Sequence, residues 1–155
     1  MQISNSILRT AQYYETDSMR IVHHGNYIKW MEEARTEFLG KAGLDWAYME
    51  RELQIMIPVL FQSVDYRYAI RFGDVTEVIC TCEKFNGVKM NFSYEFRNPK
   101  DNLLLAKGIT KHGFINANFE VVNLRDAYYE GYRSLNQFLN EREDSIEIER
   151  TTKER

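Results

Sequence analysis

The sequence has few of the features that mark special classes of protein. Its two cysteines, Cys80 and Cys82, are too few for the disulfide framework of a small secreted protein. No apolar run reaches the roughly 18 residues that suggest a membrane-spanning helix. The N-terminus shows no basic segment followed by an apolar one. We therefore expect a cytoplasmic protein without a membrane span.

There is also no excess of positive charge. The 20 lysines and arginines face 23 aspartates and glutamates, which gives a formal net charge of −3. A nucleic-acid-binding domain would show a basic stripe, so no nucleic-acid partner is expected. The chain contains no repeat and no linker rich in glycine, serine or proline. We expect one domain over residues 1–140 and a charged, solvated tail over residues 141–155.

Apolar residues recur at steps of three and four over residues 26–41, which predicts a long helix with one buried stripe. The stripe consists of Tyr27, Trp30, Met31, Ala34, Phe38 and Leu39. Asn26 is the expected N-cap. The same period predicts a short helix over residues 45–52 and a closing helix over residues 124–140.

Beyond Pro58 the apolar period changes to two, which is typical of strands. Residues 64–68 predict a strand with one buried face, and further strands are expected at residues 75–85, 90–97 and 103–116. The dipeptide Asn86-Gly87 predicts a hairpin with a type I′ turn. Residues 6–14 are expected to be extended. One long helix against an antiparallel sheet defines an α+β fold.

The chemistry concentrates in residues 13–35. Asp17 lies in an expected loop, and His23, His24 and Gly25 stand at the entrance of the long helix. The first N–H groups of a helix have no internal partner and carry partial positive charge. They would polarise a carbonyl and hold the oxyanion formed on attack. Asp17 would then serve acyl transfer, either as a general base on water or as a nucleophile.

This segment resembles the signature of hotdog-fold acyl-CoA thioesterases of the 4-hydroxybenzoyl-CoA thioesterase type. The matching residues are Glu15, Thr16, Asp17, Ile21, Val22, His24, Asn26 and Tyr27, and residues 64–74 resemble the family's second strand and its turn. The resemblance implies a long central helix wrapped by a curved antiparallel sheet. It also implies an acyl-CoA substrate, no cofactor, and a homodimer or homotetramer with its active sites at a subunit interface.

The resemblance also implies roles for individual residues. Asp17 would be catalytic, helped by His24 and Tyr13, and the backbone N–H groups near His24 and Gly25 would polarise the thioester. We assign Arg20, Asn26 and Tyr27 to substrate binding. The family has glycine at the position of Arg20, so an arginine would be strained there if the backbone needs a positive φ. Arg20 is alternatively placed to reach an acidic substrate or a CoA phosphate.

Other interpretations remain open. Glu15 is expected to be solvated, His23 to point away from the site, and both cysteines to be buried. We expect no metal site, because adjacent histidines rarely converge on one ion. Two alternative functions are a hotdog hydratase or dehydratase and a non-catalytic module that binds acyl thioesters or acyl-carrier protein.

Overall fold

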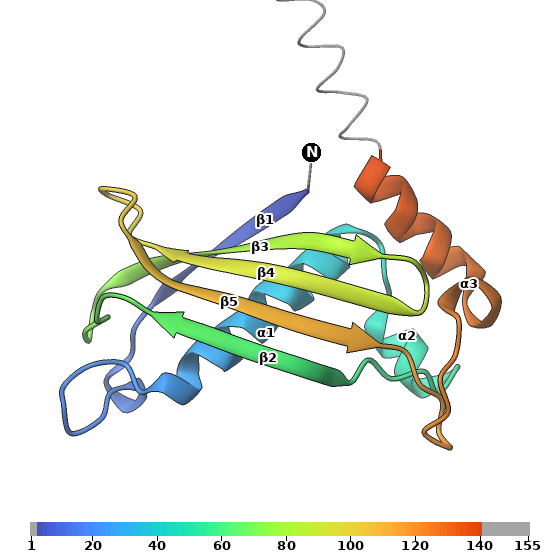
Figure 1. Cartoon of the computed structure of the whole chain (residues 1–155), viewed down its shortest axis with the longest axis horizontal. Helices are drawn as coiled ribbons and strands as arrows, with labels where there is room; N and C mark the ends of the chain where they lie inside the picture. Colours follow the sequence, from blue (N-terminus) through green and yellow to red (C-terminus); the bar gives the residue numbers. More distant parts are fainter. Residues whose placement is uncertain (1–2, 141–155) are drawn as a thin grey trace, which may run out of the picture.

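A computed structural model describes residues 3–140 of the chain, so the predicted charged tail at 141–155 lies outside the described residues. The elements are β1 (Ser4–Thr10), a 3-10 turn η1 (Tyr13–Glu15), α1 (His24–Lys41), α2 (Trp46–Arg51), β2 (Val59–Tyr66), β3 (Val75–Phe85), β4 (Lys89–Arg97), β5 (Leu104–Gly113) and α3 (Leu124–Ala127). The strands form one antiparallel sheet in the order β1-β3-β4-β5-β2, and α1 crosses one face of it (Figure 1). This is the predicted α+β arrangement.

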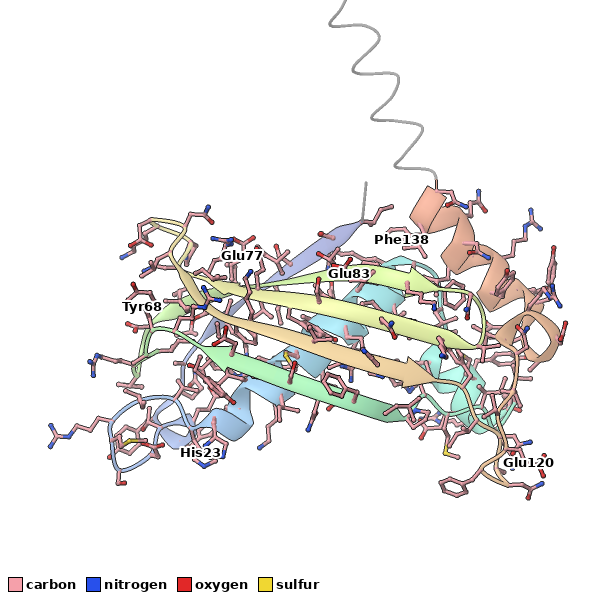
Figure 2. All side chains as sticks on the ribbon, in the orientation of Figure 1. His23, Tyr68, Glu77, Glu83, Glu120 and Phe138 are labelled. Carbon is pink, nitrogen blue, oxygen red and sulfur yellow. The ribbon has the colours of Figure 1, made fainter. Side chains whose placement is uncertain are left out.

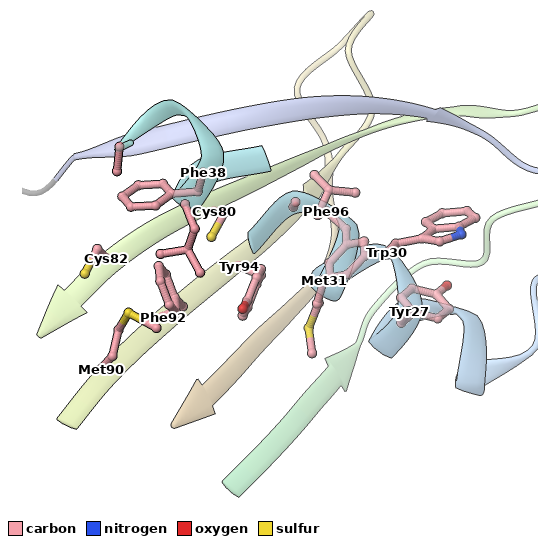
Figure 3. Close-up of a cluster of buried hydrophobic side chains, with 14 of the residues drawn as sticks. Tyr27, Trp30, Met31, Phe38, Cys80, Cys82, Met90, Phe92, Tyr94 and Phe96 are labelled. Atoms are coloured by element: carbon pink, nitrogen blue, oxygen red, sulfur yellow. The ribbon is translucent and has the colours of Figure 1, made fainter. Parts of the chain in front are cut away.

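The long helix buries the predicted apolar stripe against the sheet. Trp30, Met31, Ala34, Phe38 and Leu39 are fully buried, and Figure 3 shows several of them facing the side chains of β3 and β4. At about 25 cal/mol per Å² of apolar surface, the burial of these side chains stabilises the domain.

The predicted N-cap at Asn26 is wrong. His23 is the N-cap, and the helix begins at His24, two residues earlier than expected. His23 has extended backbone angles, and its Nδ1 accepts a hydrogen bond from the Gly25 N–H. Asn26 lies inside the first turn, and its side chain donates to a backbone carbonyl instead of capping the helix.

The central strands follow the predicted alternation. Residues of β4 at every second position are buried, and Cys80 and Cys82 face the same core from β3, as expected. Burial raises the pKa of the Cys82 thiol to about 12 and also raises that of Cys80. Both thiols are therefore protonated near neutral pH, which makes a cysteine nucleophile a poor candidate.

Three local predictions fail. The predicted hairpin after β3 forms, but its type I′ turn does not: the loop has three residues, of which only Gly87 has a positive φ. The Asn86 side chain accepts from the Val88 and Lys89 N–H groups. The closing helix is interrupted at Tyr128, and residues 129–140 continue as a separate helix. The third failure is β2, which has no buried face in the single chain. The cause is its position at the edge of the sheet, where only β5 pairs with it.

A chain of polar side chains lies between α1 and the sheet. Arg35 of α1 is buried and donates to the Tyr94 hydroxyl at 3.1 Å. Tyr94 and Thr110 share a hydrogen bond of 2.8 Å, and Thr110 lies 2.7 Å from His112 Nε2. Burial, and then the charge of Arg35, lowers the pKa of His112 to about 4. His112 is therefore neutral over most of the pH range in which the protein would be studied.

Candidate active site

Asp17 lies in a tight turn between η1 and α1. The turn closes through the Asp17 N–H, which donates to Ile21 O at 3.0 Å, and the Arg20 N–H, which donates to Asp17 O at 2.9 Å. Asp17 Oδ1 accepts from the Met19 N–H at 2.8 Å. Asp17 Oδ2 has no hydrogen-bond partner among residues 3–140, so this oxygen is the one available to act on a bound molecule.

Arg20 has a φ of 62°, in the left-handed region. Arg20 therefore has the strained backbone conformation that was expected from the glycine at this position in the related family. The side chain of Arg20 is exposed and lies outside the hollow described below.

The first N–H groups of α1 are not equally available. The Gly25 N–H donates to His23 Nδ1 at 3.1 Å, so the imidazole of the N-cap already occupies it. The His24 N–H has no acceptor within the described part of the chain. The rings of His23 and His24 lie 4.0 Å apart between centroids. Of the two expected backbone donors, His24 is the one that is open in this structure.

Asp17 and His24 line the same hollow, which has a volume of about 220 Å³. Tyr27 of α1 lies on its wall, together with Tyr66, Arg67 and other residues. The remaining wall residues are Met19, Ile21, Val22, Tyr68 and Ala69. Figure 2 shows His23, beside this helix end, and Tyr68 at the same end of the molecule. The hollow thus joins the Asp17 turn, the start of α1 and the end of β2.

Two tyrosines form the aromatic side of the hollow. The rings of Tyr27 and Tyr66 are perpendicular, with centroids 4.9 Å apart. The Tyr66 hydroxyl donates to the His24 carbonyl at 3.4 Å, a long hydrogen bond. Burial, with Tyr66 as a smaller cause, raises the pKa of Tyr27 to about 12, and burial also raises the pKa of Tyr66. Both phenols stay neutral near pH 7, so they can donate hydrogen bonds but do not act as bases.

Several predicted residues lie elsewhere. Tyr13 is 77% exposed, packs edge-on against Phe72 and does not line the hollow. The Asn26 side chain donates to Glu15 O at 2.8 Å. The expectation that Glu15 is solvated is wrong, because it is 3% exposed and its carboxylate binds three donors. The sequence did not reveal these contacts, since the donors to Glu15 come from β1, from the residue before η1 and from α1.

Tyr66, Arg67 and Tyr68 are wall residues that the sequence analysis did not assign to the site. They follow Asp17 by about fifty positions, and no local spacing connects the two segments. The backbone supplies the connection, because the Val22 N–H donates to Ile70 O at 2.7 Å. That bond fixes the residues after β2 beside the loop segment that leads into α1.

A second hollow of about 450 Å³ adjoins the first and shares Tyr68 and Ala69 with it. Arg71 and Lys100 stand on its wall, contributed by the loops before β3 and after β4. Thr76 also lines it, and its buried hydroxyl has no hydrogen-bond partner within residues 3–140. The described residues contain no group of three histidine, cysteine or carboxylate side chains placed to hold a metal ion, and no helix among them could cross a membrane.

The fold and the site together define a class: an α+β domain in which a carboxylate and the first residue of the long helix line one hollow. The family pattern of the thioesterase-like superfamily matches residues 12–130. A protein of Aquifex aeolicus is 36% identical over 104 residues, which is 67% of this chain and 79% of that protein. The acyl-CoA thioesterase YbgC of Haemophilus influenzae is 30% identical over 100 residues, 64% of this chain and 72% of YbgC.

The solved structure of a DHNA-CoA thioesterase from Staphylococcus aureus superposes with a TM-score of 0.81 and 28% identity, covering 87% of this chain and 90% of that one. The chain belongs to the thioesterase-like superfamily and has the hotdog fold. The predicted family and fold are confirmed, and so is the prediction that the protein is a thioester hydrolase.

Proposed function

We propose that the protein hydrolyses an acyl-CoA thioester to the free acid and CoA, with Asp17 as the reacting carboxylate. The observation that carries this proposal is the shared hollow: Asp17 lies on its wall with Oδ2 unpaired, and so does His24, whose N–H is open. A thioester carbonyl bound there would place its oxygen on the His24 N–H and its carbon before Asp17. The helix dipole would stabilise the negative charge that develops on that oxygen.

Two routes are compatible with this geometry. As a general base, Asp17 takes a proton from water while the water oxygen attacks the carbonyl carbon; the tetrahedral intermediate then collapses and releases the CoA thiolate, which receives that proton. As a nucleophile, Asp17 Oδ2 attacks directly, expels the thiolate and forms an anhydride that water hydrolyses. On either route, the neutral Tyr66 phenol supports the helix end through the His24 carbonyl.

The hollow also indicates the kind of acyl group. Its apolar wall contains three tyrosines, at positions 27, 66 and 68, whose rings would pack against a flat aromatic group. The similar Staphylococcus aureus enzyme is described as a DHNA-CoA thioesterase, which is consistent with an aryl substrate. We therefore place aryl acyl groups ahead of fatty ones.

The second hollow is suited to the CoA part of the substrate. CoA carries phosphates, and neither Arg71 nor Lys100 forms an ion pair with any described residue. Their charges, next to the site of Asp17, are available to an anionic nucleotide. We assign this end of the substrate to the second hollow.

The site is completed by a second copy of the chain. A volume of about 220 Å³ is below the roughly 300–1,000 Å³ of ordinary ligand pockets. Strand β2, which ends in the wall of the hollow, is an exposed edge strand with apolar Val59, Leu60 and Phe61 on its surface. An uncovered apolar edge promotes aggregation, so natural proteins cover it. A homodimer formed through β2 would both cover this edge and enclose the hollow.

The test is release of free thiol from a panel of aryl and fatty acyl-CoA thioesters, each beside its acyl-pantetheine analogue. We expect hydrolysis, fastest with an aryl thioester, and a higher KM for the pantetheine analogue. Arg71→Ala should raise the KM for acyl-CoA and leave that for acyl-pantetheine unchanged. Hydration of an enoyl-CoA without thiol release would favour a hydratase, and tight acyl-CoA binding without turnover would favour a binding module.

A further inference from the structure

Glu15 is a buried carboxylate two residues before Asp17. Its Oε2 accepts from Trp30 Nε1 at 2.7 Å and from Arg9 Nη2 at 3.1 Å, and its Oε1 accepts from the Gln12 N–H at 2.9 Å. These donors belong to α1, β1 and the residue before η1. A buried carboxylate with charge-assisted bonds to three segments holds them together strongly. Figure 3 shows Trp30 at the same end of the core as Tyr27, which lines the hollow.

The backbone carbonyl of Glu15 makes a second set of bonds. It accepts from the His23 N–H at 2.8 Å and from Asn26 Nδ2 at 2.8 Å. His23 is the N-cap of α1, and Asn26 lies in its first turn. One residue therefore binds the start of the helix through its carbonyl and the body of the helix through its carboxylate.

We infer that Glu15 and Asn26 are positioning residues that set the distance between the Asp17 carboxylate and the His24 N–H. This inference rests on the proposed function. The turn that carries Asp17 is exposed at Ser18, Met19 and Arg20 and includes the left-handed Arg20. Hydrogen bonds within the turn fix its shape, but they do not fix it relative to the helix.

The connection between turn and helix runs through residues on either side of the turn. On one side is Glu15, bound to His23 and Asn26, and on the other is Val22, bound to Ile70. Loss of the Asn26 bond would let the turn shift against α1. A displacement of about 1 Å at a reacting group can lower turnover about 100-fold.

The test uses Asn26→Asp, which keeps the size of the side chain and replaces the donor to Glu15 O by an acceptor. Glu15→Gln is the second variant. Its amide N–H₂ group would lie against N–H donors that now bind the carboxylate. We expect kcat to fall by about 100-fold in both, with KM changed by less than about threefold. The unchanged KM separates positioning from a loss of substrate binding. Because an unfolded fraction would also lower the apparent kcat at unchanged KM, kcat is calculated per folded enzyme, with the folded fraction measured by circular dichroism.

Tyr94→Phe is the matched control. It removes a buried hydroxyl that links Arg35 and Thr110, and Arg35 lies eleven positions beyond the start of α1. We expect it to lower the melting temperature as much as Asn26→Asp does while leaving kcat unchanged. An unchanged kcat in a folded Asn26→Asp variant, or an equal loss of kcat in Tyr94→Phe, would overturn the inference.

The failure of this inference is distinguishable from the failure of the proposed function. If the wild type hydrolyses no thioester, the proposed function fails, and amide hydrogen exchange still reports on the contact. The His23 and Asp17 amides should exchange faster in Asn26→Asp than in the wild type. Unchanged exchange at both amides would also overturn the inference.

Discussion

Arg20 carries a conformational cost beside the candidate catalytic residue. Its φ of 62° is one that side chains with a Cβ adopt at a cost of about 1–2 kcal/mol. The residue closes the turn of Asp17 through its N–H, which donates to Asp17 O. Its side chain is exposed, so the backbone and not a side-chain contact determines what a substitution does here.

Arg20→Gly should therefore stabilise the protein. We expect the free energy of unfolding to rise by about 1 kcal/mol, because glycine adopts a positive φ without steric cost and loses part of that gain to its freer unfolded chain. Urea denaturation measures the change. Arg20→Ala is the control: it removes the same side chain but keeps the Cβ, and a rise of equal size in that variant would contradict the explanation.

At the scale of elements, the polar chain between α1 and the sheet ends at the buried His112. Arg35 donates to the Tyr94 hydroxyl, Tyr94 and Thr110 share a hydrogen bond, and the Thr110 hydroxyl lies within hydrogen-bond distance of His112 Nε2. Burial keeps His112 neutral in the folded protein near pH 7. Its pKa of about 4 lies below the 6.5 of a free histidine, mainly because burial disfavours the charged form.

This histidine predicts how stability depends on pH. The unfolded chain binds a proton at His112 below about pH 6.5, whereas the folded chain does not until about pH 4. The stabilisation is complete above pH 6.5 and is lost as the pH falls toward 4. Between pH 7 and pH 5 we expect a loss of about 2 kcal/mol by urea denaturation. His112→Gln should flatten this dependence, and an equally steep loss in that variant would contradict the assignment.

Helices and strands with a clear apolar period were predictable from the sequence. The elements that pack against them were not. The alternation from Met90 to Phe96 defined β4, because a strand with one buried face imposes a period of two. Residues 64–68 alternate in the same way, yet Val64 is only partly buried and the other four are exposed. An apolar period of two shows that one face of a strand is hydrophobic. It does not show whether that face is buried by the same chain or by a second copy.

The candidate site was predictable only in its local part. Asp17 and His24 were found from their position before the helix, and the structure places both on one hollow. Tyr66 and the burial of Glu15 were missed, since each depends on residues distant in sequence. A carboxylate is rarely buried unless it has hydrogen-bond partners. Nothing in the sequence indicates that Trp30 is such a partner of Glu15.

At the scale of the whole molecule, the exposed edge strand β2 is where we propose that two copies of the chain form a homodimer. Leu60 of β2 and Leu8 of the opposite edge strand β1 are both 67% exposed in the single chain. Leu60→Lys should weaken the proposed dimer by about 100-fold or more, because an unpaired ammonium would be buried in its interface. It should also lower turnover, since β2 leads into the wall of the hollow.

Sedimentation velocity measures this change, with Leu8→Lys as the matched control. The control should remain a dimer of wild-type activity. A Leu60→Lys protein that dimerises as tightly as the wild type, or a Leu8→Lys protein that becomes monomeric, would place the interface elsewhere.

The most direct test of the central claim is the Asp17→Asn variant assayed for thiol release on the best acyl-CoA substrate of the panel. The substitution keeps the turn, because the amide oxygen still accepts from the Met19 N–H, but it removes the base or nucleophile. We predict that kcat falls by about 100-fold or more while the variant still binds the substrate. A folded Asp17→Asn protein that retains wild-type turnover would contradict the account.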